Sequence, residues 1–81
     1  MEIVHVGFGN ILSADRILVI ASTNSAPIKR LIQEGKNKGI VIDLTNGRKT
    51  KSLLILDSGH LVLSALAPKT LINRLSKNEK R

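Results

Sequence analysis

The sequence predicts a small α+β domain, in which two short helices accompany a mainly antiparallel sheet of about five strands. Three observations predict this class. Short runs rich in β-branched residues recur along the chain, as expected of strands. Turn sequences containing glycine separate several of these runs, which favours hairpins. Two other segments place apolar residues three and four positions apart, the spacing of an amphipathic helix. The predicted order is β-β-α-β-β-β-α.

The predicted strands are the apolar runs that lie between turn signals. They are expected at residues 3–8, 16–22, 40–44, 52–56 and 60–66. Asn46-Gly47 is typical of a two-residue hairpin turn and is predicted to join the third strand to the fourth. Asp57-Ser58-Gly59 is predicted to connect the fourth strand to the fifth.

The first helix is predicted between a polar cap and a glycine. Asn24 or Ser25 can cap it, Pro27 fits its first turn, and Gly39 is expected to end it. A second helix is predicted to open at Pro68. We expect one domain over residues 1–75, followed by a polar, frayed tail over residues 76–81.

The small size of the chain predicts self-association. Eighty-one residues bury a marginal core, and the absence of cysteine excludes disulfides as a support. The runs Ile17–Ile20, Leu53–Leu56 and Leu61–Leu63 do not alternate apolar with polar residues, so both faces of these strands require burial. The two short helices can cover one face, and the other face then requires a second subunit, unless strand twist and loops cover it. We therefore expect a homo-oligomer.

The charge of the chain predicts a polyanionic partner. Thirteen basic residues against six acidic ones give a net charge of +7, a strong bias for one small domain. No apolar run approaches the roughly 20 residues that a membrane span needs. The N-terminus lacks the pattern of a signal peptide, so we expect a cytoplasmic protein.

The segment Asn46–Lys51 is the most informative candidate site. Arg48, Lys49 and Lys51 would stand at an exposed hairpin tip, where they could reach phosphate groups. Thr50 adds a neutral hydroxyl donor for phosphate. One copy would bind weakly, whereas several copies on an oligomer would gain avidity.

Three further basic residues are weaker candidates. Lys29 and Arg30 lie in the first turns of the predicted helix, where the helix dipole does not favour cations. Simple surface charge is the favoured interpretation from the sequence alone, and a contact with DNA or with a neighbouring subunit is the alternative. Arg16 follows Asp15, so a local pair between neighbours competes with a structural or DNA-facing role.

Catalytic and metal sites are not predicted. Asp57, Ser58 and His60 are close in sequence, but a catalytic triad draws its members from separate elements. His5 and His60 are isolated and no cysteine accompanies them, which argues against zinc. Gly7-Phe8-Gly9 lacks the third glycine and the helix of a dinucleotide-binding motif. We expect no cofactor and no small-molecule substrate.

The scarcity of aromatic residues favours duplex DNA over single strands. Proteins that bind single strands stack bases on several aromatic side chains. This chain has Phe8 alone.

Four segments in chain order resemble the RemA family, bacterial regulators of extracellular-matrix (biofilm) genes. They are Val6–Asn10, Ser25–Arg30, Ile42–Lys51 and Asp57–His60, and the resemblance extends from about Ile3 to Leu75. It implies a cytoplasmic DNA-binding transcriptional regulator. It also implies closed rings of subunits, expected to be octamers, with DNA bent or wrapped along the ring.

The resemblance also implies which residues bind DNA. The family's DNA-binding arginines follow the glycine of the turn and correspond to Arg48 and Lys49. Lys49 departs from the arginine that the family often has there, which keeps the charge but loses the bidentate fork. A further family arginine corresponds to Arg16.

The leading prediction is a ring-forming regulator that binds duplex DNA mainly through its phosphates. The alternative is a structural or scaffolding oligomer whose basic surface binds a protein or an anionic membrane. A small enzyme ranks last, because no set of nucleophile, base and orienting residue is found.

Overall fold

The computed structural model describes residues 2–79, and their side chains as far as residue 75. In chain order the elements are β1 (Ile3–Gly7), β2 (Asn10–Ser13), the 3₁₀ turn η1 (Ala14–Arg16), β3 (Ile17–Ser22), α1 (Ala26–Lys38), β4 (Val41–Asp43), β5 (Ser52–Leu56), β6 (Leu61–Ser64) and α2 (Pro68–Glu79). The predicted α+β class is confirmed. Helix α2 extends into the segment 76–81, which was expected to be a polar tail.

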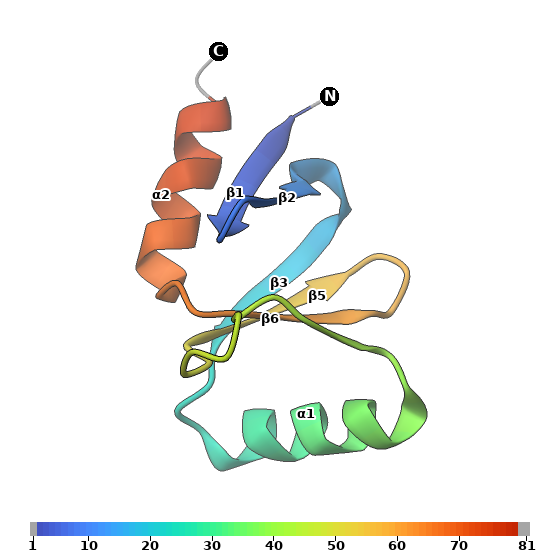
Figure 1. Ribbon diagram of the computed structural model, residues 1–81. Coiled ribbons are helices and arrows are strands. Elements are labelled where there is room, and N and C mark those ends of the chain that lie inside the picture. The colour runs from blue at the N-terminus through green and yellow to red at the C-terminus, as the bar shows by residue number, and fades with distance from the viewer. Residues whose placement is uncertain (1, 80–81) are drawn as a thin grey trace.

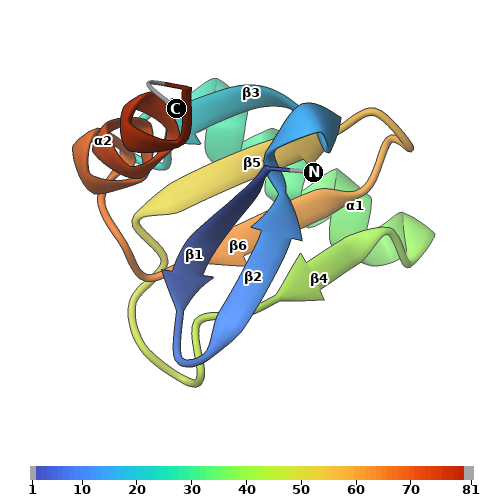
Figure 2. The ribbon, with the colours of Figure 1, turned by 90° about the horizontal axis from the view of Figure 1, so that it is seen from above.

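The elements form three layers around a four-stranded sheet of order β3-β5-β6-β4. Helix α1 lies on one face of this sheet, and the antiparallel β1–β2 hairpin lies with α2 on the other (Figure 1). Figure 2 shows the hairpin and α2 side by side over the sheet, with α1 behind it. Strands β3, β5 and β6 are antiparallel neighbours, whereas β4 runs parallel to β6.

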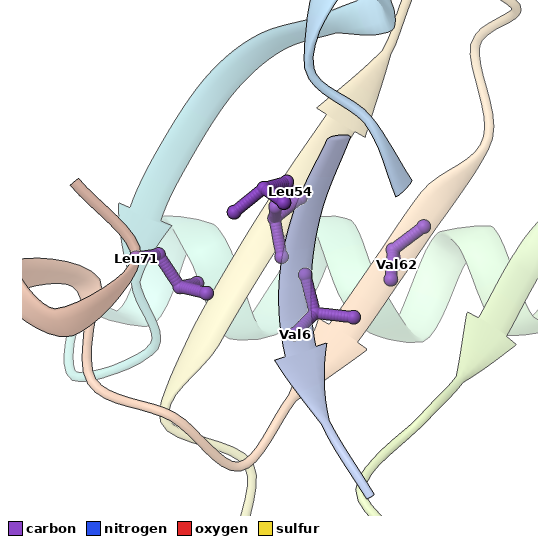
Figure 3. Packing of buried hydrophobic residues seen from close by; sticks show 5 residues of the cluster. Val6, Leu54, Val62 and Leu71 are labelled. Atoms are coloured by element: carbon purple, nitrogen blue, oxygen red, sulfur yellow. The ribbon is translucent and has the colours of Figure 1, made fainter. Parts of the chain in front are cut away.

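The face of the sheet below the hairpin holds the larger of two apolar clusters. Leu54 of β5 and Val62 of β6 point toward β1 and α2, where they meet Val6 and Leu71 (Figure 3). All four side chains are buried, as is Val4. Complete burial of such a side chain stabilises the fold by about 1.5–3 kcal/mol, so this cluster fixes the hairpin and α2 on the sheet.

The opposite face of the sheet packs against α1. Leu53, Leu61 and Leu63 form the second cluster beneath this helix. Gly35 allows a close approach, because a Cβ at that position would lie 2.6 Å from Leu61 Cδ1. The helix begins and ends as predicted: Ser25 Oγ accepts a bond from the Ile28 amide, and Gly39 has a φ of 74°.

The chain therefore covers both faces of β5 and β6 by itself, and the expectation that a second subunit must cover one of them is wrong. The argument assumed that the two helices share a face. The structure places them on opposite faces and adds the hairpin beside α2 (Figure 1). The non-alternating pattern of β5 and β6 thus reflects the three layers within one chain, and it carries no information on self-association.

The strands differ from the prediction in two respects. Residues 2–79 contain six strands where about five were expected, because residues Asn10–Ser13 form β2 after a tight turn at Phe8-Gly9. Asn46-Gly47 does turn the chain, but it does not join a hairpin, since β4 pairs with β6 and not with β5. The segment 44–51 instead crosses the end of β6, to which the amides of Leu44 and Lys51 bond through Leu63 O and Ser64 O.

Candidate nucleic-acid interface

The loop between β4 and β5 is fixed at its base by Asp43 and Thr45. One carboxylate oxygen of Asp43 accepts bonds from the Thr45 amide at 2.9 Å and the Thr45 hydroxyl at 2.6 Å. The Arg48 amide then bonds to Thr45 O at 3.0 Å and closes a turn. Asn46 and Gly47 have φ values of 55° and 80° in this turn, which is the conformation that the Asn-Gly pair favours. The loop thus carries Arg48 at a defined place.

Hydrogen bonds to Thr45 lower the pKa of the Asp43 carboxyl below its usual 3.8, the side-chain hydroxyl contributing most and the amide next. Burial opposes this shift slightly, and the charge of Lys36 adds to it. These hydrogen bonds therefore favour the ionised form of the Asp43 carboxyl. Its negative charge at the loop base serves the loop's own hydrogen bonds.

The three predicted cations of the loop are exposed and free of carboxylate partners. Arg48, Lys49 and Lys51 all lie on the surface, and no carboxylate within residues 2–75 forms an ion pair with any of them. Their charges remain available for an external anion. The carbonyl of Thr50, the predicted neutral donor, accepts a 2.9 Å bond from the buried Thr23 hydroxyl, and the Thr50 side chain is half-buried.

Phe8, which was not predicted to belong to the site, lies beside Arg48. The β1–β2 turn brings Phe8 next to the loop, and the guanidinium carbon of Arg48 lies 5.7 Å from the centre of its ring. Figure 2 shows the β1–β2 turn and the loop together at the same end of the molecule. The signal was present in the sequence, as a single aromatic residue between two glycines in a chain otherwise without aromatics.

Several shallow hollows border the loop, and two of them connect its cations to other elements. One has a volume of about 440 Å³ and is lined by Phe8, Arg48, Lys49, Lys51 and Leu66, among others. The other has a volume of about 280 Å³ and lies between the loop and α1. Lys49 lines both hollows, so the cations of the loop and those of α1 form one continuous surface.

Helix α1 contributes Lys29 and Lys36 to this surface, where they face Lys49 across the smaller hollow. Lys36 was not singled out from the sequence, although its separation of seven residues from Lys29 puts both on one side of a helix. Arg30, the other candidate in α1, is exposed but does not line either hollow. We name the set Lys29, Lys36, Arg48, Lys49 and Lys51 the cationic surface.

Arg16 lies apart from the cationic surface. It sits just before β3, whereas the loop enters β5 at Ser52, and Ile17 pairs with Leu56 at the far end of β5. The five residues of β5 separate the two places by about 13 Å of strand. Arg16 donates to Asp57 at 3.2 Å and not to its neighbour Asp15. Of the alternatives left open for Arg16, the local pair with Asp15 is therefore not formed, and its pairing joins β3 to the β5–β6 turn.

The remaining polar candidates do not assemble into a catalytic set. Ser58 Oγ lies 2.8 Å from His60 Nδ1 in an exposed turn, but the Asp57 carboxylate is directed to Arg16. Among the side chains of residues 2–75, no group of three from histidine, cysteine, aspartate or glutamate is placed to hold a metal ion. None of the helices in the described part of the chain has the length and apolar character needed to cross a membrane.

Comparison with known proteins places these residues in a family. A model for extracellular matrix regulatory protein A-like (RemA-like) proteins matches residues 3–75. A protein of Dehalococcoides mccartyi is 59% identical over 76 residues, covering 94% of this chain and 79% of its own. One from a Thermoanaerobacter species is 52% identical, covering 98% and 82%, and one from Clostridium perfringens is 49% identical, covering 98% and 89%. The names of these relatives describe regulatory proteins.

Proposed function

We propose that this chain, which belongs to the RemA-like family of regulatory proteins, is a transcriptional regulator that binds duplex DNA. It acts without catalysis, as a homo-oligomeric ring along which DNA is bent or wrapped. Arg48 and Lys49 supply the main phosphate contacts, and Lys51 and the Thr50 hydroxyl add to them. Arg16, which lies at the far end of β5 and is paired with Asp57, adds least. The resemblance to the family implies eight subunits and matrix genes as targets. Its place of action is the cytoplasm, where bacterial DNA lies.

The observation that carries this proposal is the unpaired state of the loop cations. Arg48, Lys49 and Lys51 lie exposed on a loop whose shape is fixed by other residues, and no described carboxylate balances them. Lys29 and Lys36 extend the same surface along α1. Repeated cations of this kind bind a phosphate backbone by displacing its counterions, without reading its bases.

The open edges of the sheet support self-association. Strand β3 pairs only with β5, and β4 only with β6, so the described chain leaves one edge of each free. Leu18 and Val19 on β3 are 66% and 43% exposed, and Ile42 on β4 is 41% exposed. Two different edges at opposite sides of one sheet suit a head-to-tail contact, which closes into a ring when the rotation between copies permits.

A ring would turn a weak site into a strong one. A single cationic surface neutralises few phosphates, whereas copies lined up on one duplex bind together with high effective concentration. The single aromatic residue of the chain favours duplex DNA over single strands, which need successive stacking partners. The competing role is a scaffold whose basic surface binds a protein or an anionic membrane.

The test is a titration of a labelled duplex of about 30 base pairs, three helical turns, followed by fluorescence anisotropy. We expect the affinity to fall at least about 100-fold between about 50 and about 200 mM salt. Arg48→Ala is expected to weaken binding while light scattering shows the same oligomer. A monomer by light scattering, a flat salt response, or binding to anionic vesicles but not to the duplex would contradict the proposal.

A further inference from the structure

We propose that Phe8 is a DNA wedge: its ring enters a base step of the duplex next to the phosphates held by Arg48, and favours flexible pyrimidine–purine steps. This inference rests on the proposed function. It adds Phe8 to the residues that contact DNA, and a preference for flexible base steps to the binding. The juxtaposition that carries it is an exposed aromatic ring, on a strained turn, in contact with a cation that has no carboxylate partner among the described side chains.

The turn that carries Phe8 is conformationally unusual. Phe8 has a φ of 56°, in the left-handed region that bulky side chains rarely adopt, and Gly7 and Gly9 on either side also have positive φ values. Such strain persists only where the surroundings hold it, and it is frequent at functional sites. Here the strain directs a large apolar side chain outward, where it gains little from burial.

The turn is held in place by bonds on both sides of Phe8. Asn10 Nδ2 donates to Gly7 O at 3.0 Å within the turn. The buried Ser64 hydroxyl donates to Val6 O at 2.9 Å and ties the end of β1 to β6. The ring thus projects from a rigid base, which is what a wedge requires, because a mobile side chain would lose more entropy on insertion.

The ring is not part of the core. Phe8 is 48% exposed, and neither apolar cluster includes it. Its ring instead lines the hollow that also holds Arg48, Lys49 and Lys51. An aromatic side chain among cations on an open surface can therefore contact bases while its neighbours contact the phosphates on either side.

The chemistry of the surface favours insertion at a base step of a duplex. One aromatic ring cannot stack on the successive bases of a single strand, but one apolar side chain is enough to unstack a base step and bend the helix. Pyrimidine–purine steps such as TA unstack most easily, whereas A-tracts are stiff. The wedge therefore predicts a preference for sequences that present flexible steps, without hydrogen bonds to base edges.

The experiment compares two duplexes of equal length and base composition, one with TA steps and one with A-tracts at the same positions. Affinity is read by anisotropy, and bending by energy transfer between dyes at the duplex ends. The wild-type protein is expected to bind the TA duplex at least about fivefold more tightly and to bend it. Phe8→Ala is expected to lose most of this preference and to bend the TA duplex less.

Two further variants separate a wedge from other roles of Phe8. Phe8→Leu keeps an apolar side chain that can wedge but loses the ring over Arg48, so it is expected to retain most of the bend. Ile72→Ala removes another exposed apolar group, 50% exposed on α2 and outside the hollow, and is expected to behave like the wild type. Both Phe8 variants keep a Cβ at the same φ, so thermal unfolding should change little.

Each result decides the proposal. Unchanged bending and unchanged preference in Phe8→Ala would overturn the wedge while leaving duplex binding intact. Equal loss in Phe8→Leu and Phe8→Ala would overturn it too, because the ring would then act only by orienting Arg48. A smaller oligomer for Phe8→Ala would assign the residue to a subunit contact. No duplex binding by the wild-type protein would reject the proposed function itself, a result distinct from these.

Discussion

The two ends of the four-stranded sheet both carry basic residues, but they treat the charges differently. One end of the sheet carries the C-terminus of β5, and there Arg16 is paired with Asp57 at 3.2 Å. The other carries the N-terminus of β5, and there Arg48 and Lys49 lie on the surface without a carboxylate partner among the described side chains. The first arrangement satisfies the cation within the chain. The second leaves cations available to an outside anion.

The ends also differ in what holds their loops. The loop at the paired end is a short exposed turn, with the Ser58 hydroxyl near His60. The cationic end is fixed from below by buried hydroxyls, those of Thr23, Thr45 and Ser64. The cations take no part in these bonds. The fold at the cationic end therefore does not depend on the positive charges of the loop, so these charges can be changed without changing the structure.

Charge reversal should separate the two ends most strongly. Lys49→Glu is expected to reduce duplex affinity by about two orders of magnitude or more, because every copy in the oligomer replaces an attraction to phosphate by a repulsion. Arg16→Glu is expected to cost far less, since about 13 Å of strand separates it from the cationic surface. Both are measured by anisotropy at one fixed salt concentration.

The oligomer serves as the control for this comparison. Light scattering should give the wild-type mass for Lys49→Glu, because the loop cations lie outside the exposed apolar edges of β3 and β4. If Arg16→Glu abolished duplex binding as completely as Lys49→Glu with the mass unchanged, the DNA path would have to include the far end of the sheet, and the contrast between the ends would be lost.

Loss of one serine hydroxyl at each end should show the same contrast in stability. Ser64→Ala removes a buried hydroxyl that donates to Val6 O and accepts from the Leu66 amide, and we expect the free energy of unfolding to fall by about 2 kcal/mol. Ser58→Ala removes an exposed hydroxyl beside His60 and should change it by less than about 0.5 kcal/mol. Urea denaturation measures both, and equal losses would show that the turns are held alike.

The sequence was sufficient to predict the class of fold and the residues of the loop. Apolar runs, the Ser25 cap and the glycine at position 39 correspond to elements that the structure contains. The Asn46-Gly47 turn is also present. These features are local, because each depends on residues within a few positions of one another, and local patterns are what a single sequence records well.

Strand pairing could not be predicted in the same way. Nothing local shows that β4 pairs with β6 across 20 residues of chain, Val41 with Leu61, and that the loop therefore crosses a strand end instead of closing a hairpin. The short β2 was missed because Ile11 and Leu12 alone give too brief an apolar pattern. The apolar pattern of β5 correctly predicted burial of both its faces, but it did not show which layers cover them, α1 on one side and the hairpin with α2 on the other.

The parts of the site that were missed are those made by tertiary contact. Phe8 and Arg48 are separated by 40 residues and meet because β1 and the 44–51 loop both end beside Ser64. Lys36 joins Lys49 only when α1 packs beside the loop. Arg16 pairs with Asp57 for the same kind of reason. The basic residue types were enough to predict a polyanionic partner, whereas the extent of the cationic surface could be found only from the fold.

The smallest effect that we expect concerns Asp43, the carboxylate at the base of the loop. Hydrogen bonds from Thr45 lower its pKa below the usual 3.8. A group whose pKa is lower in the folded state contributes stability above its unfolded pKa, and loses it as the pH falls through the folded pKa. Because Asp43 is exposed, this contribution should not exceed about 1 kcal/mol, present at pH 5 and above and fading below pH 4.

Asp43→Asn tests this dependence, because the amide oxygen can still accept from Thr45 but does not titrate. The difference in unfolding free energy between the wild-type protein and the variant should be largest above pH 5 and should shrink as the pH falls below 4, since only the wild-type group gains a proton there. Urea denaturation at a series of pH values measures it. A difference that stayed constant with pH would show that the Asp43 charge does not hold the loop, and the cationic end would then owe its shape to its buried hydroxyls and its turn alone.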